Sequence, residues 1–361
     1  MRKGMILVVI LVLVGVSLGV RAKAQPELDS ELYIYNWSDY MDESLLEEYE
    51  TQFGVKITYD TFASLEEMFA KIQAGAEYDV IFPSDFMIAR MIELNLLQKY
   101  DKANVPNLSN VGGEYREVWF DPGAEYCVPY QWGSTGLAVS RKLDRIPDSW
   151  GALFDPEQAA YYAQNGGINI LDDQREVIGA ALKYLGYSLN ETDPAHLEAA
   201  RDLIIAAKGN FLYYNSSDYQ DTLLIPGEVA LSHSWDGSTV KAAIATKSEE
   251  FPLGEWIHIV PKEGATRFME GMCIPATVNA KRKATAEHFI NFMMIPEHAA
   301  RNSNVTGYYS TNTPAFEFFL PELKELLPSV DVIETLEWMR PLPEESMRLW
   351  DQIWTEIRAA G

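Results

Sequence analysis

The sequence has few of the residues that metal binding and common enzyme mechanisms need. Only two of its 361 residues are cysteine, which is too few for a disulfide framework, and the five histidines are scattered along the chain. No two histidines have the spacing of metal ligands on one helix. The glycine patterns that bind phosphates or dinucleotides are absent, and after the N-terminal apolar run so is the Gly-x-Ser-x-Gly turn of serine hydrolases. We therefore expect no metal and no cofactor.

Basic residues are also scarce. The chain has 29 lysines and arginines against 53 aspartates and glutamates, which gives a net charge of −24. Nucleic-acid binding needs lysine and arginine to neutralise phosphates, so a nucleic-acid partner is excluded. An acidic surface attracts cations, although solubility is the commoner reason for such a charge. The 47% share of hydrophobic residues is ordinary for a globular protein, and the length indicates two domains.

The first 24 residues have the pattern of a secretory signal. Arg2 and Lys3 precede the apolar run Met5–Val20, and residues 22–24 fit the small-residue cleavage rule. As a helix the run would span about 24 Å, short of the ~30 Å hydrocarbon core of a bilayer. We predict export and cleavage before Gln25, with a retained N-terminal membrane anchor as the alternative. No cysteine follows the run, so a lipoprotein is not supported.

The next part of the chain alternates apolar strands with amphipathic helices. We predict strands at 32–35, 55–60 and 79–83 and helices at 42–53, 65–74 and 85–97. This order is typical of a parallel sheet with helices on both faces. Such sheets bind ligands beyond the carboxyl ends of their strands. The candidate binding loops are therefore Asn36–Tyr40 and Pro83–Phe86.

Two further segments of strand character, Cys127–Ser140 and Gly271–Pro275, flank a second region of alternating elements. In that region we predict strands at 167–171, 229–234 and 256–260 and helices at 176–185 and 194–207. Helices at 284–294, 296–302 and 346–359 complete the chain. The two flanking segments predict that the chain crosses between two domains, each built from discontinuous pieces.

The two cysteines occupy similar positions in these crossing segments. Cys127 stands in Tyr-Cys-Val-Pro and Cys273 in Met-Cys-Ile-Pro. An exported protein can join such a pair in a disulfide. Two small buried thiols fit the sequence equally well, so both possibilities stay open.

Carboxylates and aromatic rings gather at five loop positions. The groups are Trp37 with Asp39 and Tyr40; Asp85 with Phe86; Asp172, Asp173 and Glu176; Trp235 with Asp236; and Phe268 with Glu270. Ring faces attract cations, each good contact contributing about 0.5–2 kcal/mol. Carboxylates form charge-assisted hydrogen bonds with ammonium groups. A ligand with charged ends and a methylene middle would suit both partners.

Several of these residues also have a purely structural explanation. Asp173 and Glu176 have the spacing of a capping box at the start of a helix, and Asp85 is placed to cap the helix that follows it. Trp37 and Trp235 fit core positions as well as a binding site. A capping role and a binding role are compatible for Asp173 and Glu176, since the N-terminus of their helix points at the predicted cleft.

Several of these residues lie in segments that share order and spacing with one known family. The segments are 35–40, 79–84, 128–135, 172–177, 234–238, 273–275 and 307–308. From about Leu32 to its end, the chain resembles the periplasmic spermidine/putrescine-binding proteins, the solute receptors of polyamine ABC transporters. The resemblance implies the two-lobed type II periplasmic-binding-protein fold, in which crossing strands join two discontinuous α/β domains around a ligand cleft. We expect a signal peptide over 1–24, a first lobe of 25–135 with 268–313, and a second lobe of 136–267 with 314–361.

The resemblance also implies roles for single positions. The aromatic walls around the ligand's methylene chain would be Trp37, Tyr40, Trp235 and Tyr308. Ser84 matches a polar contact of the first lobe, and Asp173 and Glu176 match the acids of the second lobe that hold an ammonium group. Glu270 stands at the opposite end of the slot, where the family usually has aspartate.

Other positions bear on selectivity. Phe86 stands where some members have tyrosine, and Phe268 where members have tryptophan or phenylalanine. Met339 stands where spermidine-preferring members have glutamine. The residues that resemble the putrescine-selective branch are Ser38, Asp39, Phe268 and Met339, whereas those that resemble the spermidine-preferring branch are Asp173 and Phe86. We therefore expect both polyamines to bind, putrescine at least as tightly as spermidine.

The implied function is a periplasmic receptor without chemistry of its own. It would act as a monomer, close on a polyamine and deliver it to the membrane permease of an ABC transporter. Alternatives that fit the same fold are a receptor for thiamine, a sugar or an iron complex, and a sensor that reports polyamine to a partner. A glycoside-cleaving enzyme would need Asp173 and Glu176, or Glu270, as its acid/base pair, and nothing beyond acids in a cleft supports it.

Overall fold

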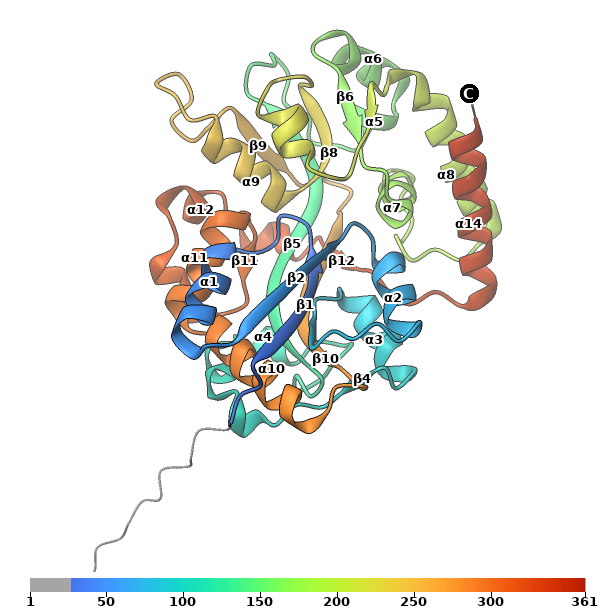
Figure 1. The fold of residues 1–361 in the computed structure, drawn as a ribbon. Helices are drawn as coiled ribbons and strands as arrows, with labels where there is room; N and C mark the ends of the chain where they lie inside the picture. Colours follow the sequence, from blue (N-terminus) through green and yellow to red (C-terminus); the bar gives the residue numbers. More distant parts are fainter. Residues whose placement is uncertain (1–26, 361) are drawn as a thin grey trace, which may run out of the picture.

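The computed structural model describes residues 27–360. The predicted signal peptide at 1–24 lies outside the described residues. Within 27–360, every helix is too short or too polar to cross a lipid bilayer. The described part forms two α/β lobes connected by long strands (Figure 1).

The first lobe begins with the predicted alternation of strands and helices. The central strand β1 pairs in parallel with two neighbours, and the three strands are β1 (Glu31–Trp37), β2 (Lys56–Phe62) and β3 (Val80–Ile81). The helices that follow them are α1 (Glu43–Phe53), α2 (Leu65–Gln73) and α3 (Asp85–Glu93). Because the strands are parallel, the segments after β1 and β3 end at the same edge of the sheet, as the sequence predicts.

The limits of these helices follow from local sequence. The Asp42 side chain accepts a hydrogen bond from the first turn of α1, and Gly54 ends that helix in the left-handed conformation, with φ at 67°. The helix predicted over 85–97 ends early, at Glu93, because the chain then forms the short strand β4 (Leu97–Gln98). β4 pairs with a crossing strand, so a tertiary contact overrides the helical pattern.

The strand β5 (Cys127–Ser140) runs from one lobe into the other and is buried along its whole length. Its first half pairs with β10 (Thr266–Pro275) and β11 (Tyr309–Ser310). Its second half pairs with β8 (Leu231–Trp235) and β9 (Trp256–Ile259). Both predicted crossing segments are therefore confirmed as neighbouring antiparallel strands.

The second lobe surrounds the smaller part of the sheet, where β8 is parallel to β6 (Ile168–Ile170) and β6 to β7 (Tyr213–Tyr214). Its helices are α5 (Gly151–Phe154), α6 (Pro156–Gln164), α7 (Gln174–Tyr184), α8 (Pro194–Ala207), η3 (Lys208–Asn210), η4 (Gln220–Leu224), α9 (Asp236–Ala245) and α14 (Glu344–Ala359). The remaining elements are η1 (Lys102–Asn104), η2 (Pro106–Asn110), α4 (Gly113–Arg116), α10 (Ala280–Met293), α11 (Pro296–Thr306), η5 (Thr313–Phe318), α12 (Pro321–Glu325), α13 (Val330–Ile333) and β12 (Glu337–Trp338).

The strand β12 is a third connection between the lobes, which the sequence did not predict. It pairs in parallel with β10 at Thr266 and Arg267. The Arg267 guanidinium lies 4.6 Å from the ring centroid of Trp338 and 5.3 Å from that of Trp132. These stacking contacts hold the chain just before Met339 against the crossing strands.

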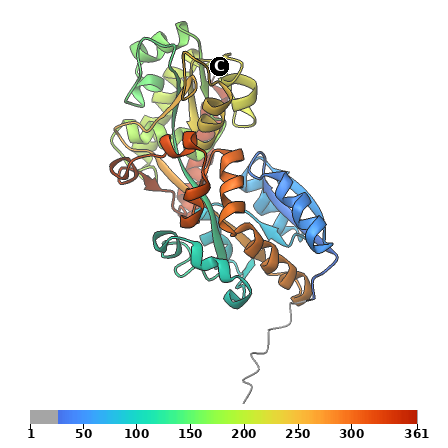
Figure 2. The same ribbon diagram turned by 90° about the vertical axis from the view of Figure 1, so that its left-hand side faces the viewer.

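Each lobe has its own hydrophobic core, and Figure 2 shows the lobes one above the other. Leu342, Trp350 and Ile353 pack in the core of the second lobe. Phe319 and Leu323 instead pack with residues of the first lobe. The lobe boundaries stay a prediction, and these contacts favour a change of lobe later than residue 314.

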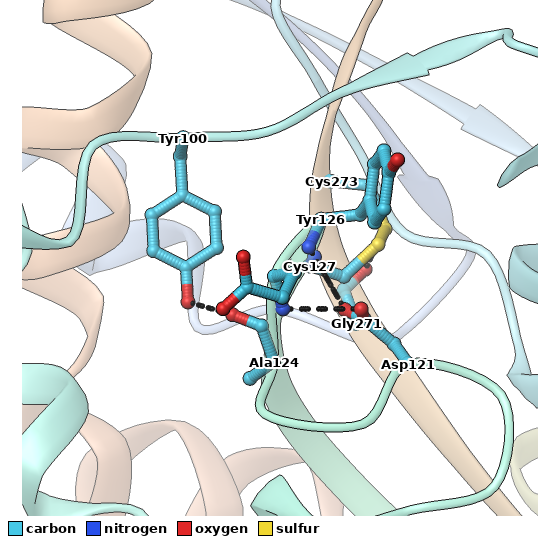
Figure 3. The surroundings of a disulfide bond; sticks show 8 residues. Tyr100, Asp121, Ala124, Tyr126, Cys127, Gly271 and Cys273 are labelled. Carbon is cyan, nitrogen blue, oxygen red and sulfur yellow. Dashed lines mark hydrogen bonds between the residues drawn. A yellow bond between two sulfur atoms is a disulfide. The ribbon is translucent and has the colours of Figure 1, made fainter.

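A disulfide joins Cys127 to Cys273, two residues 146 positions apart in the sequence, and so decides between the two possibilities left open above. The two cysteines face each other in the β5–β10 pairing, with Cα atoms 4.4 Å apart (Figure 3). The preceding turn is held by Asp121, whose carboxylate accepts hydrogen bonds from the backbone N of Tyr126 and Cys127 at 3.0 and 2.9 Å. The disulfide thus links the two sequence segments that are predicted to make up the first lobe.

Removal of this disulfide is expected to lower stability. Replacing both Cys127 and Cys273 with alanine frees a long loop in the unfolded chain, so we expect the free energy of unfolding to fall by about 2–5 kcal/mol. Urea unfolding of the variant and of the unaltered protein, with and without reductant, measures the change. Equal midpoints for all four samples would contradict this prediction.

Candidate functional site

A cavity of about 360 Å³ lies between the lobes. All fourteen residues that the sequence proposed as ligand-binding line it: Trp37, Ser38, Asp39, Tyr40, Ser84, Asp85, Phe86, Asp173, Glu176, Trp235, Phe268, Glu270, Tyr308 and Met339. The fold thus brings together residues that are up to 302 positions apart in the chain. Their contact with a ligand stays a prediction.

Glu270 provides the carboxylate at the first-lobe end of the cavity. The register of β10 against β5 shifts between Met269 and Gly271, and Glu270 bridges to Ser84 instead. Its carboxylate accepts hydrogen bonds from the Tyr40 hydroxyl at 2.5 Å and from the Ser84 hydroxyl at 2.8 Å. Only 4% of the residue is exposed, and burial raises the pKa of Glu270 to about 7.

Glu176 provides the corresponding carboxylate of the second lobe, in the first turn of α7. One oxygen accepts hydrogen bonds from the Thr135 hydroxyl at 2.9 Å and from Trp235 Nε1 at 3.2 Å, and the other accepts from the Thr266 hydroxyl at 3.0 Å. These three donors are neutral, so the hydrogen bonds orient the carboxylate without neutralising it. Burial, with repulsion from Asp173, raises the pKa of Glu176 to about 7.

The structure decides which residues cap the two helices at the cavity. Asp173 caps α7 by accepting from the backbone N of Glu176 at 3.0 Å, while the Glu176 side chain faces the donors named above. Asp173 also lines the cavity, so its capping role is compatible with the predicted contact with a ligand. The expectation that Asp85 caps α3 is wrong: the cap position is Ser84, whose hydroxyl is donated to Glu270.

Asp85 is a third buried carboxylate at the cavity. It is 1% exposed, and its Oδ2 atom accepts no hydrogen bond from the described residues. Its Oδ1 atom accepts one from the backbone N of Phe86 at 2.5 Å. Burial raises the pKa of Asp85 well above its ordinary value.

Aromatic rings from both lobes form the walls of the cavity. Tyr308 lies between two other wall residues, with ring centroids 4.7 Å from Tyr40 and 6.0 Å from Phe268. Trp37 and Trp235 are half-buried: each lines the cavity and also packs against a core. Core packing is therefore confirmed for both tryptophans, and their contact with a ligand stays a prediction.

Sequence reasoning missed several polar residues of the lining: Glu66, Arg175, Gln220, Ser238, Lys241 and Thr266. Arg175 lies inside a segment that the sequence analysis singled out, but only its acidic neighbours were considered. Its guanidinium stacks over Phe86 at 5.5 Å and donates to the carbonyl of Arg340 at 3.3 Å. The sequence around Gln220 and Lys241 has no pattern that indicates a binding site, because only the tertiary fold places η4 and α9 at the cavity.

Comparison with known proteins identifies the class of protein. Residues 44–325 match the family model of the bacterial extracellular solute-binding proteins. The chain belongs to this family, whose members bind solutes for transport and are not enzymes.

Particular relatives share most of their length with this chain. It is 33% identical to the putrescine/cadaverine-binding protein of Pseudomonas aeruginosa, covering 93% of this chain and 95% of the relative. It is also 33% identical to the spermidine/putrescine-binding periplasmic protein of Escherichia coli, covering 96% of each. Among solved structures, the spermidine/putrescine ABC transporter substrate-binding protein PotD of Streptococcus pneumoniae matches 92% of this chain and 99% of its own, with a TM-score of 0.74 and 31% identity. These comparisons and the described topology agree on the two-lobed type II fold.

Proposed function

We propose that this protein is a periplasmic receptor that binds a polyamine by closure of its two lobes and delivers it to the permease of an ABC transporter. Ligand favours the closed form because both lobes contact it only there. The relatives that bind putrescine, cadaverine or spermidine by name support the choice of ligand class. We expect the receptor to act as a monomer.

The observation that carries this proposal is the pair of buried carboxylates, Glu270 on one lobe and Glu176 on the other, in a cavity that aromatic rings also line. Each ammonium group of a buried ligand loses its hydration and needs an acid to compensate. The hydrogen-bond donors already on the two carboxylates are neutral hydroxyl and indole groups. A cation at each end supplies the missing charge, and the methylene chain lies against the rings.

Calorimetric titration across ligand classes tests the proposal. The purified, ligand-stripped protein is titrated with putrescine, spermidine, thiamine, maltose and ferric citrate. We expect micromolar or tighter binding of both polyamines, putrescine at least as tightly as spermidine. Binding of another compound but of neither polyamine would overturn the ligand class, and spermidine bound ten times more tightly would overturn the preference.

Removal of one aromatic ring from the cavity wall should weaken putrescine binding moderately. Phe268→Leu keeps an apolar side chain but removes the ring face, so we expect putrescine affinity to fall about two- to thirtyfold. The matched control is Phe316→Leu, since Phe316 is 46% exposed and lies outside the cavity lining. Equal affinities of the two variants would show that the ring does not contribute.

A further inference from the structure

One contact across the mouth of the cavity does not involve the acids at its ends. Asp39, in the loop after β1 of the first lobe, approaches two residues of the second lobe. Its Oδ2 atom accepts a hydrogen bond from Gln220 Nε2 at 2.8 Å and lies 3.5 Å from Lys241 Nζ. All three residues line the cavity.

Both donors of the second lobe also bind Asp221, a neighbouring residue of the same lobe. Asp221 Oδ2 accepts from Gln220 Nε2 at 3.0 Å and from Lys241 Nζ at 3.0 Å. Gln220 is 4% exposed, which confines its amide to this position. The side chains of Gln220 and Lys241 therefore form a binding site for one carboxylate of the opposite lobe.

One residue on each side of this contact has an uncommon backbone conformation. Asp39 and Asp218 adopt the left-handed conformation, with φ of 54° and 51°, which is uncommon for residues other than glycine. Such conformations persist where the surrounding structure requires them, often at sites that switch. Lys241 and Asp218 face Asp39, and Lys241 also pairs with Asp221. Burial raises the pKa of Asp218, and repulsion from Asp39 adds to that rise.

We infer that Asp39, Gln220 and Lys241 form a latch that holds the lobes closed, and that Asp39 is a positioning residue and not a partner of the ligand's ammonium group. Its carboxylate is already bonded to the opposite lobe, whereas the carboxylate of Glu270 is bonded only to Tyr40 and Ser84 of its own lobe. The latch stabilises the closed form with or without ligand and slows ligand release. The role of the latch in transport rests on the proposed function. Its effect on the closed form of the ligand-free protein does not.

The variant Lys241→Met separates this inference from a direct ligand role of Asp39. The latch predicts that loss of the ammonium opens the ligand-free protein and speeds putrescine release about two- to fivefold. A direct role predicts the opposite, because removal of a competing cation frees Asp39 for the ligand. Gln220→Leu removes a part-buried hydrogen bond to a carboxylate, so we expect release about tenfold faster.

Two measurements are made on each variant. Double electron–electron resonance between spin labels at the exposed residues Glu93 and Glu198, one on each lobe, reports closure without ligand. Stopped-flow dilution reports the rate of putrescine release. Lys142→Met is the matched control, since Lys142 pairs with Glu255 at 2.6 Å within the second lobe.

The inference predicts a longer or broader distance distribution and faster release for both latch variants, with the control unchanged. It is overturned if both variants keep the ligand-free distances of the unaltered protein, or if Lys241→Met slows release. Absence of putrescine binding in the unaltered protein would refute the proposed function alone, because the ligand-free distances would still test the latch.

Discussion

Replacing Glu270 with glutamine is expected to weaken putrescine binding by about 100-fold or more. Glutamine keeps the size of the side chain, but its neutral amide leaves one buried ammonium group without a counter-charge. Loss of one member of a buried charge pair costs about 3–5 kcal/mol, which corresponds to a factor of roughly 100 to 5,000 in affinity. Calorimetry with putrescine measures this factor directly.

The matched control for this variant is Asp148→Asn. It removes the same formal charge from an exposed ion pair, in which Asp148 lies 3.1 Å from Lys262 and outside the cavity lining. We expect its affinity to stay within about twofold of the unaltered protein, since exposed ion pairs contribute at most about 1 kcal/mol. If Glu270→Gln binds as tightly as the control, Glu270 does not hold an ammonium group.

Putrescine affinity is also expected to rise steeply with pH, by about 100-fold or more from pH 5 to pH 8. Burial raises the pKa of Glu270 and of Glu176 to about 7, so both groups are mainly protonated at pH 5 in the ligand-free protein. A bound ammonium group favours the ionised carboxylate and lowers its pKa. Binding at pH 5 therefore releases protons, and each released proton weakens the affinity by up to about a factor of 100.

The stability of the ligand-free protein should change in the opposite direction. A carboxyl group whose pKa is higher in the folded than in the unfolded state stabilises the folded protein. This stabilisation is complete only when the pH is below the pKa of the group in the unfolded chain, which is about 4.3 for glutamate. That contribution is lost as the pH rises through 7. Burial also raises the pKa of Asp236 to about 7, so this residue adds to the loss of stability at high pH.

Calorimetry and thermal unfolding at pH 5 and pH 8, with and without putrescine, test both directions. The variant Glu270→Gln should show a shallower pH dependence of affinity, because one of the titrating groups is gone. An affinity that is flat or falls between pH 5 and pH 8 would contradict the assignment of the two carboxylates.

Local sequence was sufficient to predict much of the first lobe, whereas the residues of the cavity followed from a family resemblance. The alternation from β1 to α3 is set by apolar periodicity and by caps such as Asp42 and Gly54, which act within a few residues. All fourteen proposed site residues line one cavity, because the resemblance to a known family supplied the long-range arrangement that local patterns lack.

The remaining features depend on contacts that are distant in the sequence. β12 forms because Trp338 stacks on Arg267 of a crossing strand, and two residues are too few to give a periodic signal. Asp85 follows Ser84, and both types of residue are common helix caps, so the sequence does not distinguish them. In the structure Ser84 has the extended backbone of a cap position, but its hydroxyl donates to Glu270 and makes no capping bond. Gln220 and Lys241 reach the cavity only through the fold of the second lobe.

Recognition of both ends of the ligand by buried carboxylates is tested most directly by comparing putrescine with butylamine. Butylamine has the same methylene chain but a single ammonium group. If Glu270 and Glu176 each hold one ammonium group, calorimetric titration at pH 8 should find putrescine bound at least about 100-fold more tightly, since each buried charge pair contributes a few kcal/mol. Equal affinities of the two amines would contradict this recognition by two carboxylates.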